Sequence, residues 1–160
     1  MATATIVPGE NIIVAEISIA APPERVFQAI TDPAQLSQWW GHKDMYRITE
    51  RTADVRPGGK WSSVGIGADG TKFRVDGEYL QVEPPRLLVH TWIASWTGSL
   101  KTIVRWELDP TEGNGTLLKI RNEGFAAAPE AAQSHGEGWK RVLGWLHGFA
   151  EKGETVDTRD

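Results

Sequence analysis

The chain has 160 residues, eight of them tryptophan and none of them cysteine, and its formal net charge at pH 7 is −4. This length fits one ordinary domain that buries a core without covalent staples. The missing cysteines exclude a disulfide framework, a thiol nucleophile and thiolate metal ligands. The basic residues are scattered, which argues against nucleic-acid binding. No apolar run approaches the roughly 20 residues of a membrane span.

The first eight residues lack the basic and apolar segments of a secretory signal. Together with the missing cysteines, this predicts a cytoplasmic protein without a membrane partner.

The next part of the chain predicts one strand and two short helices. Residues 12–20 are mostly β-branched or apolar, which is typical of a strand. The proline pair 22–23 then begins a short helix, because proline is tolerated in the first helical turn. Asp32, Pro33 and Gln35 have the pattern of a capped N-terminus and predict a second short helix.

Six further strands are predicted in the middle of the chain. They cover residues 47–55, 60–66, 72–82, 87–93, 102–108 and 116–123. Short turns rich in glycine, proline and aspartate separate most of them, so sequential strands are expected to pair antiparallel. Residues 95–99 are expected to form a polar loop.

The last segment changes to the period of a helix. One apolar stripe is formed by Trp139, Val142, Leu143, Leu146, Phe149 and Ala150, with His135 one turn earlier. The helix is expected to end after Glu151, leaving residues 153–160 as a frayed tail. One sheet and one long helix pack when the sheet curls around the helix. We therefore predict a single α+β domain over residues 1–160, with its core at 12–152 and about seven antiparallel strands.

Two cofactor-like features are interpreted as structural. Residues 65–70 match G-x-G-x-x-G, but a strand follows them, and a dinucleotide site needs a helix there to hold the phosphates. We expect a hairpin turn and no cofactor. The four histidines show no metal-ligand spacing, and no cysteine completes a zinc site, so no metal is expected.

Alternation along the strands separates a charged face from an apolar face. Arg74, Asp76 and Glu78 share one face of their strand, and Arg105 and Glu107 share one face of theirs. We expect this to be a solvated outer face with weak cross-strand ion pairs. Most charged residues are thereby removed from the interior of the curled sheet.

The apolar face and the helix stripe define a candidate ligand-binding site. Its predicted residues are Trp61, Phe73, Val75, Tyr79, Leu88, His90, Trp92, Val104, Trp106, Leu118, Ile120, His135, Trp139, Leu143 and Leu146. Such a lining suits an apolar or aromatic molecule held by a few polar groups. The alternative is that these bulky side chains fill the interior completely. For a lone inward histidine such as His90, a hydrogen-bonded core role is favoured over catalysis, and no catalytic residue is named.

Several short pieces of the sequence carry a resemblance to a known family. They are residues 21–27 (APPERVF), 31–33 leading to 39–41 (WWG), 57–61 (PGGKW), 77–79 (GEY), 84–87 (PPRL) leading to 91–92, 115–118 (GTLL), and 138–139 with Leu143. In this order the chain resembles the helix-grip fold of the SRPBCC, or START-like, superfamily. Within it, the chain is similar to homologues of the heat shock protein 90 ATPase activator. The resemblance covers about residues 12–152.

Three functions remain open at this point. The first is a module that binds a small hydrophobic molecule between sheet and helix. The second is a cyclase- or hydratase-like enzyme that uses a cavity histidine or tyrosine as acid or base. The third is a protein that modulates a chaperone ATPase, which is disfavoured because the sequence holds no counterpart of the separate N-terminal domain of eukaryotic co-chaperones. No paired carboxylates or triad lie in phase with the interior, so the first is preferred. A homodimer is left open.

Overall fold

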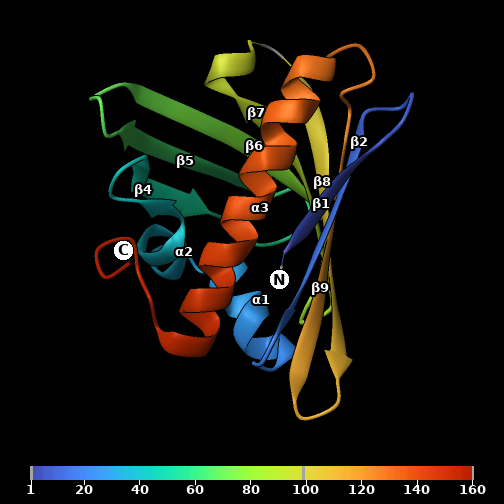
Figure 1. Ribbon diagram of the computed structural model, residues 1–160, viewed down its shortest axis with the longest axis vertical. Helices are drawn as coiled ribbons and strands as arrows, with labels where there is room; N and C mark the ends of the chain where they lie inside the picture. Colours follow the sequence, from blue (N-terminus) through green and yellow to red (C-terminus); the bar gives the residue numbers. More distant parts are fainter. Residues whose placement is uncertain (1, 99, 160) are drawn as a thin grey trace.

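The computed structural model describes residues 2–98 and 100–159 and has the predicted α+β architecture (Figure 1). The strands are β1 (Thr3–Val7), β2 (Ile12–Ile19), β3 (Gly41–His42), β4 (Tyr46–Ala53), β5 (Lys60–Gly67), β6 (Lys72–Glu83), β7 (Leu87–Ala94), β8 (Lys101–Thr111) and β9 (Gly115–Glu123). The helices are α1 (Pro23–Thr31), α2 (Pro33–Trp39) and α3 (Pro129–Lys152), with a short 3-10 turn at Ser95–Thr97. This turn lies in the segment expected to be a polar loop, of which Ser99 is outside the described residues.

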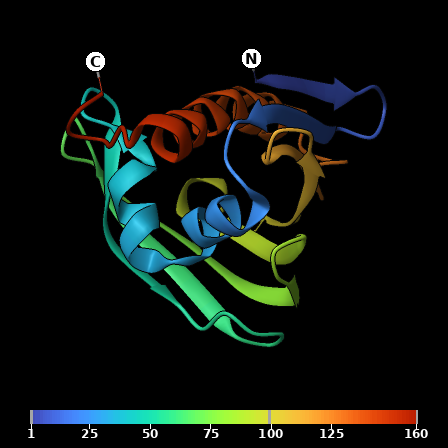
Figure 2. The same cartoon turned by 90° about the horizontal axis from the view of Figure 1, so that it is seen from below.

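All described strands form one antiparallel sheet in the order β1-β2-β9-β8-β7-β6-β5-β4-β3. The sheet curls around α3, and α1 and α2 lie inside the curve at one end of the molecule (Figure 2). This is the predicted helix-grip arrangement. The sheet has nine strands rather than about seven, because β1 and the two-residue β3 were not predicted; each extends one edge of the sheet.

The strands β6 to β9 turn their predicted apolar side chains toward α3. Val104 and Trp106 of β8 and Leu118 and Ile120 of β9 are at most 2% exposed. They alternate with charged residues on the outer face, as a half-buried antiparallel sheet requires.

A β-bulge in β4 changes which side chain faces the interior. Ile48 pairs with Gly65, but Glu50 pairs with the adjacent Val64, so Thr49 is an extra residue in the strand. Such an insertion shifts the alternation by one position. Glu50 is therefore exposed and the following residue, Arg51, turns inward.

The outer face carries ion pairs, but most run along a strand rather than across strands. Arg74 contacts Asp76 at 2.8 Å, and Arg105 contacts Glu107 at 2.6 Å. Arg105 lies directly opposite Arg121 on β9, so its favourable partner is the acid two positions further along its own strand. The expected cross-strand pairing is found between Lys119 of β9 and Asp109 of β8, at 3.9 Å, while the other pairs of this face run along a strand.

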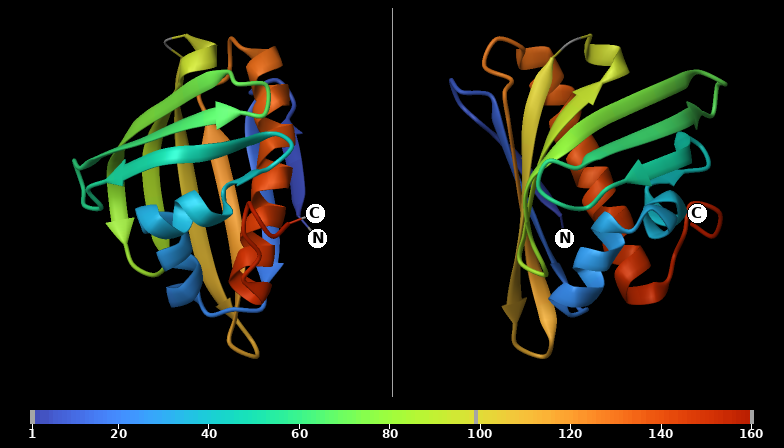
Figure 3. Two further views of the ribbon diagram at one scale, coloured as in Figure 1. Left: turned by 90° about the vertical axis from the view of Figure 1, so that its left-hand side faces the viewer. Right: turned by 180° about the vertical axis from the view of Figure 1, so that it is seen from behind.

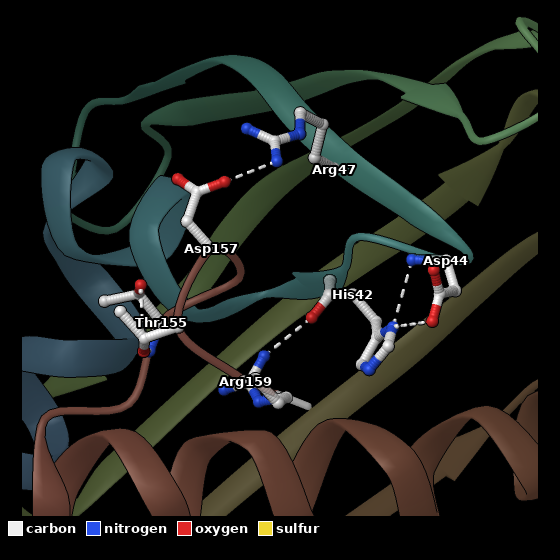
Figure 4. Close-up of polar contacts among 8 residues, drawn as sticks. His42, Asp44, Arg47, Thr155, Asp157 and Arg159 are labelled. Carbon is white, nitrogen blue, oxygen red and sulfur yellow. Dashed lines mark hydrogen bonds and ion pairs between the residues drawn. The ribbon is translucent and has the colours of Figure 1, made fainter.

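The segment after α3 is packed against the domain, contrary to the predicted frayed tail. Val156 is 3% exposed, and its backbone N–H donates to the carbonyl of Gln38 at the end of α2. Asp157 accepts from Arg47 of β4 at 2.6 Å (Figure 4). The tail thus connects the end of α3 to the β3–β4 side of the sheet.

Arg159 completes this attachment. Its Nη1 donates to the carbonyls of Trp39 and Gly41, at 3.1 and 2.7 Å, and its Nη2 donates to the carbonyl of Trp145 at 3.2 Å. These carbonyls belong to the last residue of α2, to β3 and to α3, so one guanidinium joins elements more than one hundred residues apart. One apolar residue and two charged residues, Asp157 and Arg159, anchor the tail, which is too little pattern for a sequence to indicate a packed segment.

Candidate ligand-binding site

The structure has a pocket of about 580 Å³ between α3 and strands β4 to β7. This half of the sheet diverges from the axis of α3, as the two views of Figure 3 show. The aromatic residues of the pocket wall are Trp40, Tyr46, Phe73, Trp92, Trp96 and Trp139. The volume lies within the usual range for sites that hold a small organic molecule.

The tryptophans of the wall contact one another rather than standing alone. Trp40 stacks on Trp92 with ring centroids 6.0 Å apart, and Trp139 lies 6.2 Å from both rings. Trp96 stacks on His135 at 6.2 Å and is 56% exposed, which places it at the rim. Rings packed on other rings are restricted in orientation, so this part of the wall offers a defined aromatic surface.

Gly65 provides the space for one aromatic side chain of the wall. A Cβ atom at this position would lie 2.2 Å from the ring of Phe73. The first glycine of the G-x-G-x-x-G stretch therefore serves ring packing. Gly70 has a φ of +88° in the turn between β5 and β6, which confirms the predicted hairpin.

The fifteen residues predicted for the site are distributed over three environments. Those that line the pocket are Phe73, Val75, Trp92, His135 and Trp139. A small void of about 10 Å³ is lined by Trp92 and by five other predicted residues, Trp61, Tyr79, Leu88, His90 and Trp106. Those that fill the core, with at most 1% exposure, are Val104, Leu118, Ile120, Leu143 and Leu146. The void is about the size of one water molecule, so only the first group contacts space large enough for a ligand.

Other lining residues were not predicted. Trp40 and Trp96 lie outside regular strands, so alternation gives no indication of their direction. Arg51 faces inward only because of the bulge in β4. Arg141 of α3 lies beside the apolar stripe rather than on it. The sequence signal for Trp40 is the Trp39-Trp40 pair of the family motif, which does not indicate the direction of either ring.

His90 is a hydrogen-bonded core residue. Its Nδ1 donates to the carbonyl of Thr91 at 2.9 Å, and its Nε2 accepts from the indole Nε1 of Trp106 at 2.9 Å. Because both nitrogens are used, this histidine has no free lone pair for a substrate. Burial lowers its pKa to about 4, so the ring is neutral at pH 7.

A second polar cluster fixes the orientation of Trp139. Its Nε1 donates to Oδ1 of Asn122 at 3.1 Å. The Nδ2 of Asn122 donates in turn to Oγ1 of Thr102 and to the carbonyl of Ile103, at 3.1 and 3.0 Å. A fully buried asparagine on β9 thereby holds the ring that α3 contributes to the pocket.

His135 is the histidine that faces the pocket. Its Nδ1 donates to the carbonyl of Ala131 one turn earlier, at 2.9 Å. The lone pair is therefore on Nε2. Burial lowers the pKa of His135, which favours the neutral ring at pH 7.

Arg51 is the charged residue held deepest in the wall. Its guanidinium lies 4.5 Å from the centroid of the Trp61 ring, and its Nη1 donates to Oγ of Ser63 at 2.8 Å. Burial lowers the pKa of Arg51, an effect that the neighbouring Tyr79 opposes. The guanidinium remains charged at pH 7, because the ordinary pKa of arginine lies far above neutral.

The described part of the chain holds no group of three or more histidine, aspartate or glutamate side chains placed to bind a metal ion. In the same residues, no helix has both the length and the apolar character needed to cross a membrane.

The curled sheet, the long C-terminal helix and the pocket between them define a helix-grip domain of the SRPBCC superfamily. The family model described as "Activator of Hsp90 ATPase homolog 1-like protein" matches residues 20–151. The chain belongs to this family, as the sequence motifs predicted.

Solved structures show the same fold. A protein from Rhodobacter sphaeroides is 25% identical with a TM-score of 0.78, over 92% of this chain and 96% of that one. CalU16 from Micromonospora echinospora is 26% identical with a TM-score of 0.66, over 96% of this chain and 85% of that one. DynU16, a protein of the dynemicin biosynthetic locus, is 22% identical with a TM-score of 0.74; the match covers 92% of this chain but 49% of DynU16. None of the curated proteins compared with the chain matches it.

Proposed function

We propose that this protein binds a small apolar or aromatic molecule in the pocket between α3 and β4 to β7. The observation that carries the proposal is a space of about 580 Å³ with a wall of mutually packed aromatic rings. Rigid rings offer a large contact area with little loss of side-chain freedom on binding. We expect micromolar affinity, about −8 kcal/mol.

Two glycines of α3 provide a matched test. Gly138 lines the pocket, and a Cβ there meets nothing closer than 4.0 Å, so a longer side chain enters the pocket without a clash. Gly144 is exposed, and a Cβ there has nothing within 4 Å. Methionine at either position also replaces glycine, a poor helix former, by a good helix former. This exchange should stabilise the folded protein by roughly 0.5–1 kcal/mol.

Gly138→Met is expected to raise the Kd for apolar ligands about tenfold or more, because it occupies part of the pocket, while Gly144→Met leaves the Kd unchanged. Both variants should unfold at or above the wild-type temperature. The measurement is calorimetric titration with 2-naphthamide, 2-naphthoate, 1-dodecanol and dodecanoate, alongside thermal melts. Binding of none of these probes to the wild type, or equal loss in both variants, would contradict the proposal.

An acid–base reaction in the same pocket is the second candidate. His135 lines the pocket, its lone pair is on Nε2, and within the described residues no protein group bonds to that atom. This is the arrangement that a cyclase- or hydratase-like enzyme requires of a general base. His135→Gln would abolish turnover of a bound compound while leaving its affinity within about threefold. Stimulation of a chaperone ATPase ranks third, because nothing on the described residues indicates a protein partner.

A further inference from the structure

We propose that the ligand is an amphipathic organic acid, whose carboxylate binds Arg51 and whose apolar part lies against the aromatic wall. The inference rests on the proposed function, since it names the chemical class of the molecule that the pocket takes.

The first observation is the environment of Arg51. It donates to the Ser63 hydroxyl, lies over the Trp61 ring and has the Tyr79 hydroxyl beside it, and its Nε is buried without a hydrogen-bond acceptor in the protein. Among the described residues, no carboxylate forms an ion pair with it, although eight ion pairs elsewhere join an arginine, lysine or histidine to an acid within 3.9 Å. Buried charges in proteins are normally paired.

The second observation is the charge of the pocket wall. Arg51, Lys72 and Arg141 line it, and none of its lining residues is an aspartate or glutamate. This contrasts with the whole chain, which has 21 acidic and 17 basic residues. The pocket is therefore electropositive within an acidic protein, and it attracts anions.

The third observation is a second buried donor on the same wall. Nε1 of Trp92 has no acceptor in the protein, and Trp92 lines the pocket together with Arg51 and Ser63. A carboxylate only accepts hydrogen bonds and has about four lone-pair positions. It thus matches a wall that holds a guanidinium without an acidic partner, although Arg51 and Trp92 line the small void as well as the pocket. A single negative charge is favoured over a phosphate dianion, because Arg51 is the one lining cation among the described residues that has a fully buried nitrogen without an acceptor.

The test compares each acid with its neutral analogue on the intact protein: 2-naphthoate with 2-naphthamide, and dodecanoate with 1-dodecanol. On the wild type, at least one acid is expected to bind roughly tenfold to a hundredfold more tightly than its neutral partner, the range for hydrogen bonds to charged groups. Arg51→Met should abolish this preference and leave the affinity for the neutral partner within about threefold. Arg51→Lys, which keeps the charge, should restore part of the preference.

Arg105→Met is the matched control, because Arg105 lies on the outer face and pairs with Glu107. It should keep the full preference for the acid. The naphthalene and dodecyl pairs distinguish aromatic acids from fatty acids.

The outcomes separate the two proposals. Equal affinity for acid and neutral partner on the wild type would overturn the present inference and leave the ligand-binding proposal standing. Binding of no probe would overturn both. If Arg51→Met does not fold, the wild-type comparison and Arg51→Lys still decide.

Discussion

Replacing Trp139 by alanine is expected to lower the free energy of unfolding by about 3–5 kcal/mol, a large part of the stability of a domain this size. Trp139 is 4% exposed and contacts the rings of Trp40, Trp92 and Trp106. Its removal opens a cavity at the junction between α3 and the sheet, where the surrounding rings cannot all move inward.

Part of this loss comes from a hydrogen bond rather than from packing. Without the indole, Oδ1 of Asn122 is left buried without its donor, which costs about 1–3 kcal/mol. Trp139→Phe separates the two effects, because phenylalanine keeps much of the ring and no donor. Trp139→Phe should lower the free energy of unfolding by less than Trp139→Ala does, but by more than a surface substitution does.

Urea denaturation followed by far-ultraviolet circular dichroism measures these differences. Trp96→Ala is the control, because Trp96 is 56% exposed and its loss should cost about 1 kcal/mol or less. If the free energy of unfolding of Trp139→Ala were within about 1 kcal/mol of the wild-type value, the helix would not be part of the central core as described.

Acid is expected to destabilise the protein through His90, by about 3 kcal/mol between pH 7 and pH 4. Burial first, and the Arg51 charge to a lesser extent, lower the pKa of His90 from 6.5 to about 4 in the folded state. Between these values the unfolded chain binds the proton and the folded protein does not. Stability is therefore complete above pH 6.5 and is lost as the pH falls toward 4.

The matched variant is His90→Gln, which does not titrate and keeps an acceptor for the indole N–H of Trp106. It should be less stable than the wild type at pH 7, and the difference should shrink as the pH falls to 4. Carboxylates titrate in both proteins, so only the difference between the two curves reports on His90. Parallel curves over this range would show that His90 is not held neutral in the fold.

The main layers of the fold could be predicted because two periodicities dominate the sequence. Alternation along β6 to β9 and the apolar stripe of α3 both produce buried rows, such as Val104 and Trp106 on β8 and Leu143 and Leu146 on α3. The edge strands were not predicted because they are too short to show an alternation of apolar and polar residues. β3 has only two residues, Gly41 and His42, and is a strand because it pairs with β4.

The pocket could be predicted only in part, because periodicity gives the direction of a side chain and not the space left in front of it. Where α3 presents Leu143 and Leu146, the interior is filled. Where it presents Ser134 and Gly138, the sheet side chains border an open volume. The inward direction of Arg51 depends on one extra residue in β4, which alternation cannot locate.

The packing of the tail implies an order of events in folding. Arg159 closes loops of 118 and 120 residues when it bonds to Gly41 and Trp39, so these contacts form only after most of the chain is in place. The same contacts bury little apolar surface and are expected to open first in the native state. Their opening would release the β3–β4 hairpin, which carries Met45 and Tyr46 of the pocket wall. Under the ligand-binding proposal, we expect a ligand to enter on the side of the last element to assemble.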